Sequence, residues 1–464
     1  MTQLIGTART TVRAPFQGVV AFAIAAVAIP LVCGALVARS PLFPIAILVG
    51  IGGVYLAVRS IVFPVALTGL PSLLIGLYGS NPLPGKVVFA ALTLWLLLGL
   101  ALAFLSGAWP ASALDRRLLT PPLALVAALT VLLVARLDSG AYPTTKIELY
   151  LAQCVPVIVA GVLIGLNARS FRLYVLIAFA VAAANAVLLV YRLGGNSATQ
   201  VYSARFSIST TYNPIWAGRS AAEGVLIALA LTLGSFSRRT TLLGYVMLPL
   251  LGAALLASGS RGPVVGLLAA LVVLVALTVT DRRLRSRLGR IAVGVTAAVV
   301  AAALIVPSSA FDRSVSFLLG DTSGLSSNGR TELWSKALSL FGSHFFTGVG
   351  TGGFSNYAAS DNYPHNILLE AGAELGVVGL TIVVLLLFVS LRTAFRAWSI
   401  APDQRERILA ALVASLLVAA TVNSLLSGGI ESTDEIFLVA GLAYGLVVRY
   451  LRDGRRAVAQ ASSA

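Results

Sequence analysis

The hydrophobic positions of this chain fall into long runs that are separated by short polar segments. Apolar stretches of roughly 20 residues, the length that crosses a bilayer core of about 30 Å, recur along the whole sequence. The pattern predicts membrane-spanning helices near residues 18–38, 43–58, 61–78, 87–107, 121–136, 147–166, 171–192, 215–234, 241–257, 263–280, 291–307, 366–391, 408–426 and 436–449. Several runs are short or contain Pro and Gly, so we expect an all-α, polytopic membrane protein with about 12–14 transmembrane helices.

Composition agrees with this pattern. Of the 464 residues, 58% are hydrophobic and only 11% are charged, whereas roughly a quarter of the residues are charged in an ordinary soluble domain. The first apolar run is a full span long and many others follow it, so we interpret it as a retained anchor rather than a cleaved signal peptide. The two cysteines, Cys33 and Cys154, lie inside apolar stretches and indicate neither a disulfide framework nor a zinc site.

The positive charge of the chain indicates its orientation. The formal net charge is +16, but the arginines form short clusters between apolar runs and lack the interleaved aromatic residues of a nucleic-acid platform. The clusters lie at residues 9–13, 116–117, 169–172, 238–239, 282–290, 392–407 and 449–456. With an even number of spans all of them fall on one side, which the positive-inside rule makes cytoplasmic. We therefore expect a multi-pass protein of the inner membrane that binds membrane lipids and no nucleic acid.

Because successive spans alternate between the two sides of the membrane, residues 308–365 are predicted to form one large outward-facing segment. It separates the N-terminal spans, in residues 1–307, from the C-terminal spans and tail, in residues 366–464. The segment contains no run long enough to span, yet it carries several aromatic residues, and 330–340 is typical of a short amphipathic helix. Structured outward loops of this size usually carry function.

Three outward positions are candidates for chemistry. Arg261 lies between small residues at the start of a span, and Arg330 lies at the start of the predicted loop helix, where the helix dipole favours an anion. His365 precedes a span whose Glu370 and Glu374 lie four residues apart and so share one helical face. Two guanidinium groups and one titratable imidazole are suited to a transfer reaction in which a diphosphate leaves.

Each position also has a purely structural interpretation. Arg261 could extend to the membrane interface, and Arg330 could pair with Glu332 on the surface. His365 could simply begin a helix, and Glu370 and Glu374 could cap arginines. The second histidine, His344, lies among phenylalanines and is assigned a structural role.

Together these motifs resemble the bacterial O-antigen ligase and polymerase superfamily. The resemblance depends on Ser-Arg-Gly at 260–262, Gly-Arg-x-x-x-Trp at 329–334, Gly-Val-Gly-x-Gly-x-Phe at 348–354, and Pro-His-Asn at 364–366 followed by Glu-x-Gly-x-x-Gly at 374–379. It covers residues of about 200–390, and the rest of the chain agrees only in being apolar spans. Arg205, with Tyr-Asn-Pro at 212–214, is similar to the preceding outward loop of the family, although Ile215 replaces its usual second Asn.

The resemblance implies a GT-C-like membrane glycosyltransferase that moves a glycan from a polyprenyl diphosphate carrier to an acceptor hydroxyl on the outer face of the inner membrane. It implies that Arg261 and Arg330 bind the diphosphate, that His365 is the general base, and that Arg205, Asn366, Glu370 and Glu374 are candidate supporting residues. The reaction would invert the anomeric configuration without metal or cofactor, and the acceptor would be a glycan, a lipid or a protein. The sequence agrees in having neither an Asp-x-Asp cluster outside the membrane nor a Gly-rich nucleotide loop after a strand.

Three alternative functions stay open: a polymerase, a transporter and a scaffolding protein. A polymerase of repeat units would use the same kind of donor, although the outward His365 favours a ligase within the family. A transporter of lipid-linked glycans would be expected to place ionisable groups deep within its spans, whereas nearly all charges here lie at span ends. A scaffolding protein would not explain the order of outward Arg, Arg and His.

Overall fold

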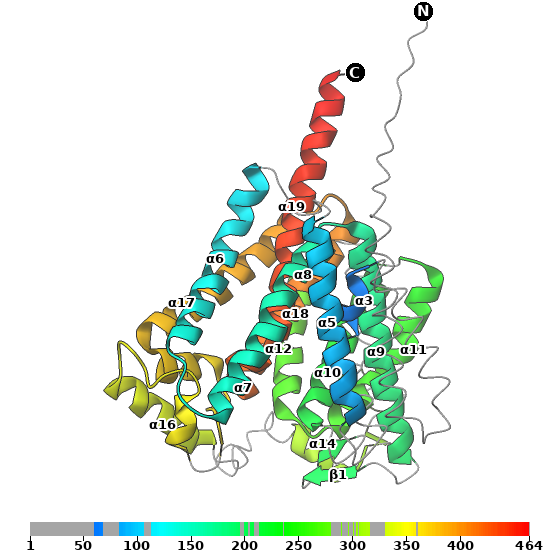
Figure 1. Cartoon of the computed structure of the whole chain (residues 1–464). Coiled ribbons are helices and arrows are strands. Elements are labelled where there is room, and N and C mark those ends of the chain that lie inside the picture. The colour runs from blue at the N-terminus through cyan, green and yellow to red at the C-terminus, as the bar shows by residue number, and fades with distance from the viewer. Residues whose placement is uncertain are drawn as a thin grey trace, which may run out of the picture.

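The structure, a computed structural model, is helical and consists of spans that pack side by side (Figure 1). It describes residues 60–67, 83–105, 113–194, 199–202, 205–207, 213–234, 236–279, 306–315, 330–358 and 361–463, with the single positions 289, 296, 300, 303 and 304. The helices that form the bundle are α3 (Val62–Ala66), α5 (Leu83–Leu105), α6 (Ala113–Ala135), α7 (Ala141–Leu149), the π-helix η1 (Tyr150–Cys154), α8 (Val155–Gly165), α9 (Ala168–Gly194), α10 (Pro214–Gly234), α11 (Arg238–Ala257), α12 (Arg261–Thr278), α17 (Ile367–Ser399), α18 (Gln404–Ser427) and α19 (Asp434–Ser463).

The prediction of an all-α, polytopic membrane protein is confirmed. Seven helices in the described part of the chain are long and apolar enough to cross a membrane, and α7, η1 and α8 together form one of them. Most of the predicted spans from 87–107 onward match observed helices within a few residues. The spans predicted at 18–38 and 43–58, and most of those at 61–78 and 291–307, lie outside the described residues.

Small residues allow two of the spans to approach closely. Gly161 and Gly165 of α8 face Gly441 and Gly445 of α19, so each helix carries a Gly-x-x-x-Gly pattern at the contact. A Cβ atom added to Gly441 would lie 2.2 Å from the carbonyl oxygen of Ile158, which is closer than real Cβ atoms come. In the membrane, where apolar side chains gain nothing by leaving lipid, this close backbone packing is a main source of helix association.

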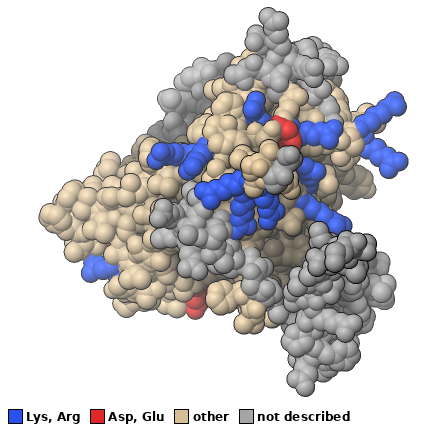
Figure 2. All heavy atoms as spheres, turned by 90° about the horizontal axis from the view of Figure 1, so that it is seen from above, with Lys and Arg blue, Asp and Glu red and all other residues tan. Residues whose placement is uncertain are grey.

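One end of the bundle is strongly basic. Figure 2 shows Lys and Arg side chains gathered on the end from which α19 projects. Exposed arginines come from the N-terminal turns of α9, α11 and α18 and from the C-terminal parts of α17 and α19: Arg169, Arg172, Arg238, Arg239, Arg392, Arg396, Arg405, Arg407, Arg455 and Arg456. The positive-inside rule predicts that this end faces the cytoplasm.

A buried carboxylate fixes three spans together at the basic end. Glu406 of α18 pairs with Arg449 of α19, and its Oε1 atom accepts a hydrogen bond of 2.9 Å from Arg172 of α9. The hydroxyl of Tyr450 donates to the second carboxylate oxygen at 3.0 Å. Both oxygens of this buried carboxylate thus have hydrogen-bond partners, as a buried charge requires.

Short extramembrane elements cover the opposite end (Figure 1). They are the antiparallel strands β1 (Thr199–Tyr202) and β2 (Arg205–Ser207), and the helices α14 (Ser308–Val315), α16 (Arg330–Ser343) and η3 (Gly353–Asn356). Helix α16 begins at Arg330, where the sequence predicts the start of a loop helix. Residues 316–329 and 359–360 of the predicted outward segment lie outside the described residues.

The long helix α17 is interrupted near its start. Its 33 residues would measure about 50 Å at 1.5 Å per residue, more than the roughly 30 Å of a bilayer core. Gly376 has φ 68° and ψ −163°, so the helix breaks between a short outer piece and a long spanning piece. Val377 then donates its N–H to the carbonyl of Phe345 at 2.7 Å, which satisfies a backbone group that the break would otherwise leave unpaired.

Candidate functional site

The turn before α12 presents Arg261. Gly259 adopts a left-handed conformation with φ 58°, and Ser260 is extended, so the chain reverses between α11 and α12 and Arg261 becomes the first helical residue. The Nε of Arg261 donates to the carbonyl of Arg313 on α14 at 3.1 Å. The hydroxyl of Ser314 donates to the carbonyl of Leu256 at 2.9 Å, so α14 is attached to the end of α11. Arg261 and Arg313 are therefore neighbours.

Arg330 completes a group of three arginines. Burial lowers the pKa of Arg330, the charges of Arg313 and Arg261 lower it further, and Tyr363 and Asp361 act in the opposite direction. Burial and the charge of Arg261 likewise lower the pKa of Arg313. The like charges of these neighbouring guanidinium groups form an electropositive site, and a bound anion would relieve their repulsion.

The surface pairing considered for Arg330 is not seen. Glu332 is exposed, and within residues 330–358 and 361–463 no ion pair joins it to Arg330. Arg313 was not a candidate from the sequence, because nothing in the sequence predicts that α14 folds back onto the turn before α12.

His365 lies in a strained and partly buried position beside this group. Its φ is 56°, and it is the only non-glycine residue with positive φ in the described part of the chain. Such a conformation costs free energy in a residue with a Cβ and is often found at functional sites. The indole N–H of Trp334 donates to the carbonyl of Pro364 at 3.0 Å, and the ring of Tyr363 lies 4.4 Å from the imidazole, centroid to centroid. These contacts hold the strained turn in place.

A carboxylate that the sequence did not predict accompanies the histidine. The Nε2 atom of His365 lies 3.4 Å from Oδ1 of Asp361, four residues earlier. Burial lowers the pKa of His365, Asp361 opposes this shift, and the charge of Arg330 adds to it. The balance favours a neutral imidazole that can accept a proton, with a nearby anion to stabilise the imidazolium that would form.

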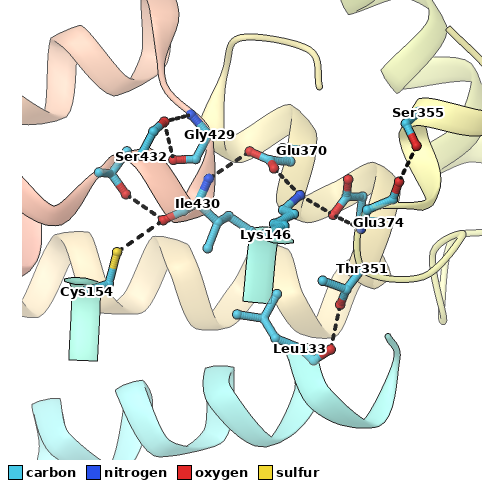
Figure 3. Close-up of polar contacts among 12 residues, drawn as sticks. Leu133, Lys146, Cys154, Thr351, Ser355, Glu370, Glu374, Gly429, Ile430 and Ser432 are labelled. Carbon is cyan, nitrogen blue, oxygen red and sulfur yellow. Dashed lines mark hydrogen bonds and ion pairs between the residues drawn. The ribbon is translucent and has the colours of Figure 1, made fainter. Parts of the chain in front are cut away.

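Glu370 and Glu374 do not cap arginines; they share a buried lysine. Lys146 of α7 pairs with Glu370, and its Nζ atom lies 2.6 Å from Oε2 of Glu374 (Figure 3). All three side chains are at most 1% exposed. The same carboxylates bind two backbone N–H groups: Gly352 donates to Glu374 at 2.8 Å and Ile430 donates to Glu370 at 2.9 Å. We call Lys146, Glu370 and Glu374 the buried triad.

The glycine-rich stretch at 348–354 packs closely against α7 and α17, the two helices that carry the triad. A Cβ atom on Gly348 would lie 2.2 Å from the backbone of Glu374, and one on Gly352 would lie 2.7 Å from Pro143. Both glycines have positive φ. The segment also donates from Val349 to Ala373 and from Gly350 to Glu374, at 2.9 Å each. The glycines allow close backbone approach to α7 and α17.

The remaining candidates have simpler surroundings. The side chain of Asn366 accepts from the N–H groups of Leu368 and Leu369 and so caps α17. Arg205 lies on β2, which packs against α10 and α11, and its participation in the arginine group stays a prediction. His344 is exposed with its Nδ1 3.0 Å from the hydroxyl of Ser343.

The structure thus brings Arg261, Arg330 and His365 together and adds Arg313, Asp361 and Lys146. Lys146 had a weak sequence signal, since it is a single cation at the outward start of an apolar run. In the portion that the structure describes, no group of three or more His, Cys, Asp or Glu side chains is arranged to hold a metal ion. Metal independence itself stays a prediction.

Comparison with known proteins supports the resemblance in the sequence. Residues 245–384 match the model of a family described as O-antigen ligase, and this segment contains the turn with Arg261, the loop with Arg330 and His365, and the start of α17. No curated protein sequence matches the chain. One similar solved structure is described as "Structural coordination of polymerization and crosslinking by a peptidoglycan synthase complex"; it has 16% identity and a TM-score of 0.43, and the alignment covers 72% of this chain and 97% of that chain. The O-antigen ligase resemblance is therefore confirmed, and it concerns the part of the chain that carries the candidate site.

Proposed function

We propose that this protein is a membrane glycosyltransferase that moves a glycan from a polyprenyl diphosphate carrier to an acceptor hydroxyl on the outer face of the inner membrane. The observation that carries the proposal is the group of Arg261, Arg313 and Arg330 beside His365, at the end of the bundle opposite the arginine-rich face. A group of cations with an adjacent neutral base fits a reaction in which a diphosphate leaves as a hydroxyl attacks.

The proposed reaction is a single displacement. The acceptor oxygen forms a bond to the anomeric carbon while the bond from that carbon to the diphosphate oxygen breaks, and the electron pair of the broken bond stays with the diphosphate. The guanidinium groups bind the charge that develops on the diphosphate, because they remain protonated and present paired donors. Attack from the face opposite the leaving group would invert the anomeric configuration.

His365 receives the proton of the acceptor hydroxyl in this scheme. A partly buried, neutral imidazole is a competent base, and Asp361 stabilises the imidazolium after the transfer. The position of His365 on the turn before α17, fixed by Trp334, keeps the base beside the arginines.

The arginines provide the direct test. In a deletion strain complemented with variants, Arg261→Ala or Arg330→Ala should abolish most glycan attachment and cause lipid-linked glycan to accumulate, with normal protein abundance in the membrane. The lysine variants should recover only part of the activity, because a point charge does not reproduce the planar fork. Arg239→Ala, which removes an exposed arginine at the basic end, is the matched control. Normal attachment in both alanine variants would refute the proposal.

The same strain separates ligase from polymerase. Loss of a ligase leaves full-length glycan on the lipid carrier, whereas loss of a polymerase leaves single repeat units on the carrier and on the acceptor. The outward histidine favours the ligase within the resemblance, and a transporter would instead leave the lipid-linked glycan on the cytoplasmic side.

A further inference from the structure

A rigid turn between α18 and α19 borders the candidate site. In the 3-10 helix η4 (Ile430–Ser432), the N–H of Ile430 is bound by Glu370 of the buried triad, and the carbonyl of Ile430 accepts from Thr433 at 3.1 Å and from the thiol of Cys154 at 3.6 Å (Figure 3). The N–H of Gly429 donates to the hydroxyl of Ser432 at 2.9 Å. The backbone on both sides of Glu431 is therefore fixed.

Glu431 is buried and incompletely bound. Its side chain is 7% exposed, and its Oε2 atom has no hydrogen-bond partner among the described residues. The carboxylate lies beside that of Glu370, because a Cβ atom placed on Gly429 would be 2.9 Å from Oε2 of Glu431 and 3.1 Å from Oε2 of Glu370. A buried carboxylate oxygen without a partner is costly, and the ligand that relieves the cost must donate a hydrogen bond.

A second unpaired group lies on α7. The hydroxyl of Tyr142 is buried and, in the described structure, has no hydrogen-bond partner. Tyr142 is one helical turn before Lys146, whose Nζ lies 5.9 Å from the centre of its ring, and it interacts electrostatically with Glu431. A carboxylate that accepts and a phenol that donates or accepts are a combination suited to neighbouring hydroxyl groups.

The charge of Glu431 acts on the histidine side of the site. It is among the charges that raise the pKa of His365, and it is the leading charge that raises the pKa of Tyr363. The charges that act on Arg330 come instead from Tyr363, Asp361 and the other two arginines. Glu431 therefore interacts with His365 and Tyr363 and is not among the charges that act on Arg330.

We propose that Glu431 and Tyr142 form a subsite that binds hydroxyl groups of a sugar ring in the acceptor and so positions the attacking hydroxyl at His365. This inference rests on the proposed function and narrows its acceptor to a glycan or glycolipid. Glu431 lies outside residues 245–384, the part that matches the O-antigen ligase family, so the subsite would be contributed by the C-terminal part of this chain.

The test uses membranes of the deletion strain that contain each variant. The donor is the lipid extract of the deletion strain, in which untransferred lipid-linked glycan accumulates, and the acceptor is a detergent extract of its envelopes, added as a dilution series. Glu431→Gln should raise the apparent KM for the acceptor extract roughly 10- to 100-fold, the loss expected for a hydrogen bond to a charged group. Tyr142→Phe should raise it by about 2- to 10-fold, and the KM for donor should change less than twofold in both.

Thermal unfolding distinguishes binding from a structural role. Because Oε2 of Glu431 and the hydroxyl of Tyr142 have no partners within the described part of the protein, both variants should melt at or above the temperature of the unmodified protein. Glu148→Gln, an exposed glutamate on α7, is the control and should change nothing. Unchanged acceptor KM in both variants, or lost activity together with a lower melting temperature, would overturn the subsite. If Arg261→Ala also retained full transfer, the proposed function would fail as well; if Arg261→Ala were inactive, only the subsite would fail.

Discussion

Replacement of Lys146 by Met removes the cation that contacts both carboxylates of the buried triad. In the unmodified protein one ammonium group serves Glu370 and Glu374, which are completely buried. After Lys146→Met the two carboxylates face each other without a counter-charge. Removal of one partner from a buried ion pair typically costs about 3–5 kcal/mol. Since 1 kcal/mol shifts the melting temperature of a large domain by about 2 °C, we expect a decrease of roughly 6–10 °C.

We attribute the expected decrease in melting temperature to the unbalanced charge and not to the change in side-chain volume. A variant in which the triad is neutral separates these two causes. In Lys146→Met with Glu370→Gln and Glu374→Gln no charge remains within the triad, and the amide oxygens can still accept from the N–H groups of Ile430 and Gly352. The triple variant should therefore melt within a few degrees of the unmodified protein and well above the single variant. The control is Lys336→Met, which removes an exposed lysine on α16.

The assay is thermal unfolding of the detergent-solubilised protein, followed by the fraction that remains monodisperse after heating. Transfer activity in membranes is measured in parallel, because the triad also holds the glycine-rich segment. A single variant that melts like the control would show that the triad contributes no stability. A triple variant as unstable as the single one would refute the charge-balance explanation.

Four further outcomes follow from the site and its orientation. Because burial lowers the pKa of His365 below its usual 6.5, transfer should remain high at pH 6.5 and fall only as the pH decreases through the lowered pKa; a pH–rate profile with a decline that begins above 6.5 would contradict this. Since Asp361 opposes that shift, Asp361→Asn should move the acidic decline to still lower pH as well as reduce the rate, and an unmoved profile would exclude the contact. His365→Ala should reduce the transfer rate about 10²–10⁴-fold with little change in donor KM, as measured in the membrane assay. A periplasmic reporter should be active when inserted within residues 308–365 and inactive when fused after Arg456, and the opposite result would reverse the orientation.

Much of the fold could be predicted because hydropathy alone determines which segments enter the membrane. The observed α10, α11 and α12 begin and end within a few residues of the predicted spans. The start of α16 at Arg330 could be predicted from its amphipathic pattern. Local sequence determines these features, so no knowledge of distant contacts was needed.

The contacts between the site residues could not be predicted, because local sequence does not determine them. The pairing of Lys146 with Glu370 joins residues 224 positions apart, and nothing in either segment specifies the other. The hydrogen bond between Arg261 and Arg313 joins residues 52 positions apart in the sequence, with the rest of α12 between them. Asp361 is only four residues from His365, but four-residue spacing predicts a contact within a helix, and this segment is an irregular turn.

The break of α17 at Gly376 also limits how this protein can be re-engineered. The backbone groups around the break are bound by Phe345, Val349 and Gly350, so the outward segment and the membrane helix complete each other's hydrogen bonds. A chimaera that receives the outward segment of a related protein without the matching first turns of α17 would leave polar backbone atoms exposed to lipid. A chimaera between relatives should therefore fold only when the transplanted fragment extends through Val377, whose N–H is bound by Phe345, and this boundary is a practical guide for grafting.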